Sequence, residues 1–301
     1  MALSLSTEAG VWREQPDVGN HARLPGVGRE LSVKNDDPGN ASTQAFVFDD
    51  ATGYELMMGR WSALVAEPFL AWLALPSGRE WLDSGCGDGS FTEQLVRRQS
   101  PSSVVGVDPA PAQLAFARRR ASVASASFLQ GDAQALPVPS ASVDAAVMAL
   151  VLFFVPDPLT GIRELLRVTR PGGTIAAYPW DIAGGGFPLQ VIIDAARDEG
   201  YEPQKPPSAW AATLEASEAL WVNAGSLDVQ TRQFEVSRPF DSYEDFWRTA
   251  YSNPRLRELF LSLSSAALKR LNGRVREQLG VTTGGPVIVK ARANAVKGRR
   301  A

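Results

Sequence analysis

One stretch of the chain combines an acidic residue with a glycine-rich turn, an arrangement that can bind a ligand through the backbone. The sequence EWLDSGCGDGSFTEQL places Asp83 after an apolar pair and then Gly85, Gly87 and Gly89 at alternate positions. Glycine has no Cβ, so such a turn can bend sharply and let a ligand approach closely. The helix expected over Phe91–Arg98 would present unpaired N–H groups and a positive dipole end above the turn.

Two further acids follow apolar runs downstream. The run VVGVD ends in Asp108, which lies 19 positions after Gly89, and Gly131-Asp132-Ala133 follows another short apolar run. An acid about 20 residues beyond such a turn binds the hydroxyls of a ribose. Asp132 can accept a hydrogen bond from an adenine amino group, and Ala133 can offer a backbone N–H to a ring nitrogen. These residues therefore predict a nucleoside ligand.

Two cofactor classes are compatible with this pattern. Dinucleotide sites prefer Gly-x-Gly-x-x-Gly, whereas here the third glycine comes one position early, at Gly89, and Ser90 takes its place. Asp83 and Asp88 flank the turn with negative charge. Like charges repel at close range, so the turn favours a ligand with an ammonium and a sulfonium over one with two phosphates.

Alternating strands and helices are expected to bring these residues together. A parallel sheet with helices on both faces places the carboxyl ends of its strands at one edge, where an open α/β sheet binds its ligand. Asp83, Asp108, Asp132 and Ala149 would lie there, and Asp144 at the opposite edge would be structural. The strands expected after the first, which ends at Asp83, are Ser102–Val107, Ala126–Gln130, Val143–Ala149 and Thr174–Tyr178, and the helices after Phe91–Arg98 are Ala112–Arg120 and Leu159–Arg170.

The flanks of this core are less regular. Residues 1–44, which contain the one histidine, His21, are expected to be a disordered leader, and residues 45–296 to form the domain. Two short helices broken at Pro68 should precede the first strand. Residues 181–280 are expected to add helices, a strand over Leu227–Arg238 and an aromatic lid over an acceptor. The candidate lid residues of this segment are Trp210, Trp221, Phe240, Tyr243, Phe246, Trp247 and Tyr251. A last strand over Pro286–Ala291 would be followed by a frayed basic tail at 297–301.

Composition excludes several classes of function. The 301 residues carry a formal charge of −3, so nothing indicates nucleic-acid binding. The longest purely apolar run, Ala145–Val155, is too short for the ~20 residues that span a bilayer. One cysteine, Cys86, excludes an intrachain disulfide and favours a reducing, cytoplasmic location. Clusters of cysteine and histidine around a metal are excluded by count, and the oligomeric state stays open.

Four ordered motifs carry a resemblance to a known family. The series LDSGCGDG, VVGVD, GDAQALPVPSASVDAAV and LLRVTRPGGTIAAY resembles the class I S-adenosylmethionine-dependent methyltransferases, specifically the bacterial type 11 methyltransferase domain, over about Trp81–Tyr178. The flanking GYELMMGRWS and PVIVKARANAVKG are also similar to that group. The resemblance implies a Rossmann-like, doubly wound α/β fold with a seven-stranded sheet, its last strand antiparallel, plus a helical lid insertion. The cofactor-binding core would cover about 79–180.

The resemblance also implies roles for individual residues. Asp83 and Gly85 would face the methionine moiety of the cofactor, and Gly87 would allow its close approach to the backbone. The remaining cofactor contacts would come from Asp108 on the ribose, Asp132 and Ala133 on the adenine, the carbonyl of Ala149 near the amino group and Arg60 on the carboxylate. Cys86 lies where the family often has cysteine, and we interpret it as a packing residue.

The implied function is transfer of a methyl group from S-adenosylmethionine to a small-molecule acceptor by in-line displacement. Tyr178, Trp180 and Asp181, at the exit of the fifth strand, are the candidates for catalysis, and the domain offers no histidine as a base. The alternatives are a cofactor-binding protein without catalysis and a nicotinamide-dependent enzyme. Methylation of nucleic acid or protein is disfavoured by the mild acidity, and the acceptor and the methylated atom stay open.

Overall fold

The computed structural model describes residues 58–123, 125–201, 204–281 and 285–301. All of them belong to the compact unit Ala45–Ala301, which is distinct from the unit Met1–Gln44. The expected leader at 1–44, its His21 and the first part of the helical region from Ala45 lie outside the described residues.

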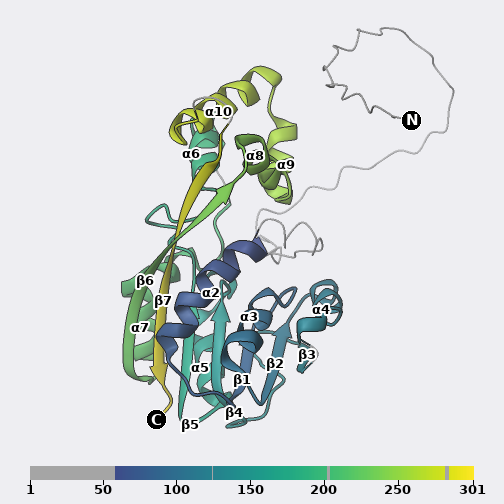
Figure 1. The fold of residues 1–301 in the computed structure, drawn as a ribbon. Helices are drawn as coiled ribbons and strands as arrows, with labels where there is room; N and C mark the ends of the chain where they lie inside the picture. Colours follow the sequence, from purple (N-terminus) through teal and green to yellow (C-terminus); the bar gives the residue numbers. More distant parts are fainter. Residues whose placement is uncertain (1–57, 124, 202–203, 282–284) are drawn as a thin grey trace, which may run out of the picture. The chain divides into compact units, whose positions relative to one another are not determined.

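A seven-stranded sheet forms the centre of the unit, in the order β3-β2-β1-β4-β5-β7-β6 (Figure 1). Strands β1 to β5 are parallel, whereas β7 is antiparallel to both β5 and β6. The strand order reverses between β1 and β4, so the predicted switch point and the predicted fold class are confirmed. The strands are β1 Glu80–Ser84, β2 Ser103–Asp108, β3 Ala126–Gln130, β4 Val143–Ala149, β5 Thr169–Tyr178, β6 Leu227–Phe240 and β7 Val287–Arg299.

Helices cover both faces of the sheet, because its central strands are apolar on both sides. Val147 packs into the buried cluster with α2 and α3, whereas its neighbour Met148 packs into the cluster with α5 and α7 (Figure 1). This follows from the period of two along a strand. The helices are α2 Arg60–Leu73, α3 Ser90–Gln99, α4 Pro111–Ala117, α5 Pro158–Val168, α6 Gln190–Arg197, α7 Leu214–Asn223, α8 Tyr243–Tyr251, α9 Pro254–Ser262 and α10 Ser265–Gln278, with short 3₁₀ helices η2 Ala121–Val123, η3 Leu152–Phe154 and η4 Ala209–Ala212.

Helix α2 differs from the expected pair of short helices. It runs unbroken from Arg60 to Leu73 and contains Pro68. Proline inside a helix costs about 3 kcal/mol because it removes a backbone hydrogen bond. The helix continues because Trp61, Val65 and Phe69 on its inner face are almost fully buried against the sheet. Packing of that face therefore overrides the local signal.

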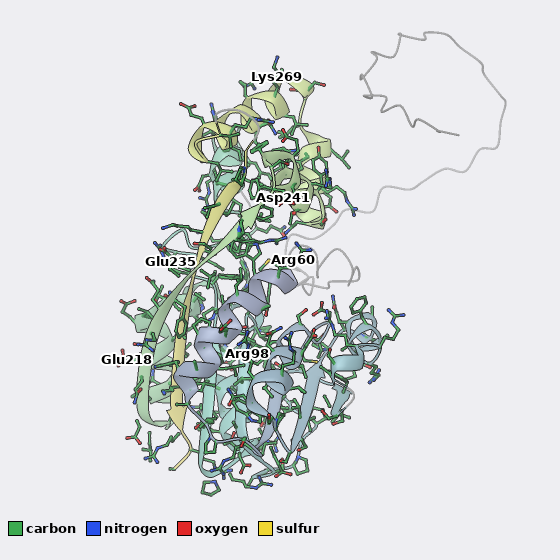
Figure 2. The ribbon with its side chains drawn as sticks, viewed as in Figure 1. Arg60, Arg98, Glu218, Glu235, Asp241 and Lys269 are labelled. Carbon is green, nitrogen blue, oxygen red and sulfur yellow. The ribbon has the colours of Figure 1, made fainter. Side chains whose placement is uncertain are left out.

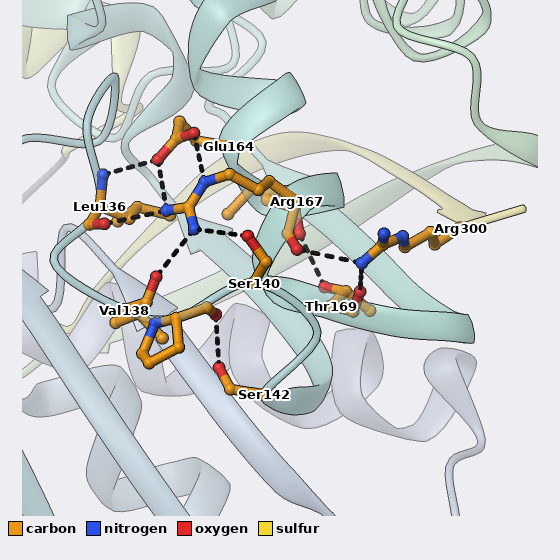
Figure 3. Close-up of polar contacts among 10 residues, drawn as sticks. Leu136, Val138, Ser140, Ser142, Glu164, Arg167, Thr169 and Arg300 are labelled. Carbon is orange, nitrogen blue, oxygen red and sulfur yellow. Dashed lines mark hydrogen bonds and ion pairs between the residues drawn. The ribbon is translucent and has the colours of Figure 1, made fainter.

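The carboxyl-terminal residues also differ from the prediction. Residues 297–301 are not a frayed tail, because β7 continues to Arg299 and pairs with β5. Lys297 donates to the Trp72 carbonyl at 2.8 Å, and Arg300 donates to the carbonyls of Arg167 and Thr169 (Figure 3). Lys297 and Arg300 therefore bind carbonyls of other elements, whereas Arg299 pairs with the carboxylate of Asp228.

Strands β6 and β7 extend beyond the rest of the sheet as a two-stranded ribbon. Strand β6 pairs with β7 from Val287 to Arg299. Strand β5 pairs only with residues Val296–Arg299 of β7, so the first part of β7 has β6 as its one partner strand. At the far end of the ribbon, α6, α8, α9 and α10 form a helical lobe (Figure 1). Within the described ranges, no helix is both long enough and apolar enough to cross a membrane.

Candidate functional site

The glycine turn follows β1 and is held against β2. Gly85 donates to the Val107 carbonyl at 2.7 Å, and its φ of +77° suits glycine. A Cβ on Gly85 would lie 2.3 Å from a Val151 methyl, so packing also requires glycine there. Gly87 has φ +53°, and a Cβ there would meet no atom of the described part of the chain within 4 Å. The turn therefore has one packed glycine and one that faces open space.

Asp83 is the most deeply buried acid of the site. Its side chain is fully enclosed, and Thr92 on α3 donates to its Oδ2 at 2.6 Å. Its Oδ1 is buried without a hydrogen-bond partner among the described residues. Burial raises the pKa of Asp83 to about 7, and the charges of Asp108 and Asp88 add to the increase. A buried oxygen of this kind is suited to a cationic or hydrogen-bond-donating ligand.

Asp108 ends β2 and accepts hydrogen bonds from the backbone. Its Oδ2 accepts from Gly87 N at 2.9 Å, and its Oδ1 accepts from Ala110 N at 2.9 Å. Burial raises the pKa of Asp108, against the opposing effect of these two bonds. Each carboxylate oxygen has a second lone pair, so Asp108 can still accept from two hydroxyls of a ligand. The structure thus brings Asp83, Gly87 and Asp108 together, as predicted.

The negative charge that the sequence suggested at Asp88 is present but is paired with an arginine, and it still raises the pKa of Asp83 and Asp108. Arg120 binds its carboxylate at 2.8 Å, and both side chains are largely buried. Arg120 also donates to the Asp88 carbonyl at 2.6 Å and to Glu93 at 3.1 Å, while the other Asp88 oxygen caps Ser90 N at 3.0 Å. The ion pair offsets the charge of Asp88. Asp88 and Asp108 both act electrostatically on Asp83, so the three acids interact at the turn.

Arg120 holds the turn closed, and its replacement tests that role. We expect Arg120→Met to weaken cofactor binding about 5- to 20-fold and to lower stability by roughly 1–3 kcal/mol, because buried Asp88 loses its partner. Calorimetric titration and thermal melting measure the two effects. Arg98→Met is the matched control, since Arg98 pairs with the exposed Glu67. Equal behaviour of the two variants would contradict a role for Arg120 at the turn.

Asp132 and Ala133 lie beside Asp108, in the loop after β3. Gly131 N donates to the Asp108 carbonyl at 3.2 Å, and the exposed Asp132 accepts from Gln134 N at 2.7 Å. The continuation of this loop is anchored by Glu164 of α5, which accepts from Leu136 N at 2.8 Å (Figure 3). The loop is therefore fixed next to β2, where an adenine group would have to lie.

Ala149 lies at the end of a central strand, whereas Arg60 lies at the start of a helix. Ala149 ends β4, at the rim that follows β1, and pairs with Tyr178 of β5. Arg60 is exposed at the start of α2 (Figure 2). Burial lowers the pKa of Arg238 on β6, and the charge of Arg60 adds to this decrease. A contact between Arg60 and a cofactor carboxylate stays a prediction.

The three candidates at the exit of β5 are all engaged in packing. Tyr178 is fully buried, and its ring lies 4.7 Å from that of Phe69 between centroids. Asp181 pairs with Arg292 at 3.0 Å and caps Gly184 N at 3.0 Å, which anchors the loop after the strand to β7. Trp180 is buried edge-on to Trp61, and its indole N–H has no partner among the described residues.

Most aromatic residues that the sequence suggested for a lid pack against one another. Trp247 stacks on Phe260 at 4.9 Å between ring centroids, and Tyr251 lies 4.8 Å from the same ring. Trp221 is buried on the opposite face of the sheet, with α5 and α7. Cys86 packs against Leu114 and Phe128, and burial raises the pKa of its thiol, as expected of a packing residue.

Sequence reasoning missed three residues that shape the site. They are Thr92, which binds Asp83, Arg120, which binds Asp88, and Val151, which packs on Gly85. Thr92 could have been inferred from its place in the first turn of the helix after the glycines. Arg120 and Val151 carry no local signal, because their partners are 32 and 66 positions away in the sequence.

Residues 82–177 match the family model described as a methyltransferase domain. The chain is 28% identical over 186 residues to a trans-aconitate 2-methyltransferase of Azoarcus sp., across 62% of this chain and 66% of that protein. It is 37% identical over 111 residues to a malonyl-[acyl-carrier protein] O-methyltransferase of Serratia marcescens, across 37% of this chain and 42% of that protein. The chain thus spans less than two thirds of the length of these relatives.

A solved structure shares the fold. It is a phosphoethanolamine N-methyltransferase 2 of Haemonchus contortus in complex with S-adenosyl-L-methionine, with a TM-score of 0.52, 15% identity and coverage of 87% of this chain and 61% of that one.

Proposed function

We propose that the chain is a class I S-adenosylmethionine-dependent methyltransferase that transfers a methyl group to a small-molecule acceptor, because residues 82–177 match the family model described as a methyltransferase domain. The two relatives are named for trans-aconitate and for a malonyl group on a carrier protein. The first name supports a small-molecule acceptor, whereas the second names an acyl group carried on a protein. The role of residues 181–280 as a lid over that acceptor is part of the proposal.

The observation that carries the proposal is the pair of buried carboxylates at the glycine turn. Asp83 has a buried oxygen without a partner, Asp108 lines the same turn, and Gly87 faces open space. A ligand with an ammonium and a sulfonium would relieve the repulsion between these acids, whereas a pyrophosphate would increase it. The residues present therefore fit S-adenosylmethionine better than a dinucleotide.

The chain would contribute binding and orientation to the reaction. S-adenosylmethionine supplies a methyl group that is already activated. Asp83 would hold the methionine moiety and Asp108 the ribose hydroxyls, and the bare backbone at Gly87 would let the cofactor approach. Asp132 and Ala133 would hold the adenine, and Ala149 would offer a carbonyl to the amino group. Holding an acceptor atom in line with the methyl group can supply most of the acceleration.

Calorimetric titration with S-adenosylmethionine, S-adenosylhomocysteine and NAD tests the cofactor. We expect binding of the first two and not of NAD. Replacement of Asp108 and Asp132 together by Ala should weaken S-adenosylmethionine at least tenfold, or about 1.4 kcal/mol. Unchanged affinity in that double variant would contradict the site.

Transfer of a labelled methyl group into the small-molecule fraction of a bacterial lysate tests the activity. Label in a product would separate an enzyme from a protein that only binds the cofactor. Binding of S-adenosylmethionine without any transfer would indicate a protein that only binds the cofactor. Binding of NAD would favour a nicotinamide-dependent enzyme.

A further inference from the structure

One buried hydrogen-bond donor at the rim of the sheet has no acceptor. Trp180 follows β5 and is 1% exposed, and its indole N–H has no partner among the described residues. A buried N–H in this state is costly, because it has lost its hydration without gaining a hydrogen bond in the protein. Such a donor is therefore suited to an acceptor atom that arrives with a ligand.

The backbone on both sides of Trp180 is fixed to β7. Asn294 N donates to the Pro179 carbonyl at 2.9 Å, and Asp181 N donates to the Arg292 carbonyl at 2.9 Å. The Asp181 carboxylate also pairs with the Arg292 guanidinium at 3.0 Å. The fold therefore sets the position of the indole without using its N–H, and a ligand would find the donor already in place.

Trp180 lies on the rim that carries the cofactor residues and packs on the same face of the sheet. Trp180 and Tyr178 belong to the buried cluster that includes α2 and α3. The Tyr178 ring lies 5.8 Å from that of Phe91 on α3, between centroids, and the next residue of α3, Thr92, donates to Asp83. In the sheet order, β4 separates β5 from β1. The donor is thus two strands along the rim from the glycine turn.

Trp81 provides a comparison within the same chain. Its indole N–H is also buried without a partner among the described residues. Trp81, however, lies near the start of β1, away from the edge where an open α/β sheet binds its ligand. An unpartnered indole N–H is therefore not by itself a sign of a ligand, and the place of Trp180 on the rim is what distinguishes it.

We propose that the indole N–H of Trp180 donates a hydrogen bond to an oxygen atom of the methyl acceptor. This inference rests on the function proposed above. An indole N–H can donate but not accept, so it fits a carbonyl, hydroxyl or carboxylate oxygen and does not fit an ammonium group. Leu189 and Ile192 belong to the same buried cluster as Trp180. An apolar surrounding with few polar groups is typical of sites for small molecules.

Binding of the acceptor would require a local movement at the start of α2. The Trp180 N–H is enclosed in the ligand-free chain, as is Oδ1 of Asp83. Trp61, in the first turn of α2, meets the Trp180 ring edge-on at 6.4 Å between centroids. The ends of helices open more readily than their interiors. A shift confined to that turn would admit an oxygen atom to the indole.

The role of Trp180 in this proposal is to bind and orient the acceptor. An indole has no basic lone pair, so Trp180 cannot remove a proton from the acceptor. Its hydrogen bond would be present both in the bound ground state and in the transition state. Loss of such a uniform contact raises KM and leaves kcat nearly unchanged.

The variant Trp180→Phe tests the donor, because it keeps an apolar ring and removes the N–H. The full chain is incubated with methyl-labelled S-adenosylmethionine and serial dilutions of the small-molecule fraction of a bacterial lysate. We expect the half-saturating concentration of that fraction to rise about 10- to 100-fold in the variant, with the Kd of S-adenosylmethionine changed less than about twofold. Trp81→Phe is the matched control and should keep both values, and thermal melting checks that each variant folds.

The outcomes separate this inference from the proposed function. Equal half-saturation of Trp180→Phe and the wild type would overturn the inference and leave the proposed function intact. A weaker Kd for S-adenosylmethionine with unchanged half-saturation would assign the N–H to the cofactor and would also overturn the inference. A labelled product whose elemental composition contains no oxygen would overturn it as well. No transfer of label by the wild type would overturn the proposed function itself.

The proton–nitrogen correlation spectrum of the indole groups gives a readout that needs no variant. A hydrogen bond moves the signal of an N–H proton downfield. The wild-type chain is saturated with S-adenosylhomocysteine, and the unlabelled methylated product purified from the lysate reaction is then added. We expect the Trp180 signal to move downfield and the Trp81 signal to stay in place. An unchanged Trp180 signal in the saturated complex would overturn the inference.

Discussion

Replacing Gly87 by Ala should abolish cofactor binding and leave the fold intact. The φ of +53° costs an alanine about 1–2 kcal/mol, and no atom of the described residues lies within 4 Å of the added methyl group. In the proposed complex, that open space is where the nucleoside approaches the backbone. We therefore expect the Kd of S-adenosylmethionine to rise at least 100-fold while the melting temperature falls by only a few degrees. Calorimetry and thermal melting measure the two quantities.

Two other glycines make this prediction specific. Gly78 also has a positive φ, +75°, and also faces open space, but it precedes β1 at the opposite edge of the sheet. Gly78→Ala should lower the melting temperature by a similar amount and keep the affinity. The Gly85→Ala variant should have a lower melting temperature than either, because its added methyl group would overlap Val151. Equal affinity of the Gly87→Ala and Gly78→Ala variants for the cofactor would contradict the proposal that the nucleoside approaches the backbone at Gly87.

Replacing Asp83 by Asn should stabilise the ligand-free protein and weaken cofactor binding. The pKa of Asp83 is raised from 3.8 to about 7 by burial. A raised pKa contributes stability that is present below the unfolded value and is lost as the pH rises through about 7. At pH 8 the neutral Asn avoids the cost of a buried charge, at most about 4 kcal/mol. We expect a higher melting temperature at pH 8, little difference at pH 4, and a Kd for S-adenosylmethionine raised at least tenfold.

The pH dependence of binding gives a second readout at the same residue. The ammonium of the cofactor should prefer ionised Asp83, so the wild-type affinity should rise with pH through about 7, and this rise should be absent in the variant. Asp144→Asn is the matched control. Hydrogen bonds from Glu80 N and Arg170 lower the pKa of Asp144, so its loss should destabilise the protein at neutral pH and leave binding unchanged. An Asp83→Asn protein that is less stable than the wild type at pH 8 would contradict the argument.

Local signals were sufficient for the core of the fold. Apolar runs that end in Asp83, Asp108 and Gly131 predicted parallel strands whose ends meet, and the pairing of β1, β2 and β3 confirms this. The tight turn was readable because three glycines at alternate positions have few other uses. Only the bounds were less accurate, as in β5, which begins at Thr169 instead of Thr174. Its Pro171-Gly172-Gly173 segment reads as a break, although the structure accommodates it as an irregularity in the strand.

Signals that depend on distant partners were not readable in the same way. Three features depend on contacts between residues far apart in the sequence: the unbroken α2, the ordered carboxyl terminus and the ion-paired Asp88. The contact between Trp61 and Arg238 is the extreme case, because the two residues are 177 positions apart. Nothing near Arg238 in the sequence distinguishes it from an exposed arginine on an alternating strand.

The sequence by itself determined the parallel core, the glycine turn and the acids at its rim, since each is encoded by neighbouring residues whose backbone preferences and polarity act over a few positions. Only the tertiary structure decided which acids keep their charge and which arginines are buried. The reason is physical: the pKa and hydration of a side chain depend on everything packed around it. Asp83 and Asp88 are five positions apart in one turn, yet burial leaves one with an unpartnered oxygen and Arg120 pairs the other.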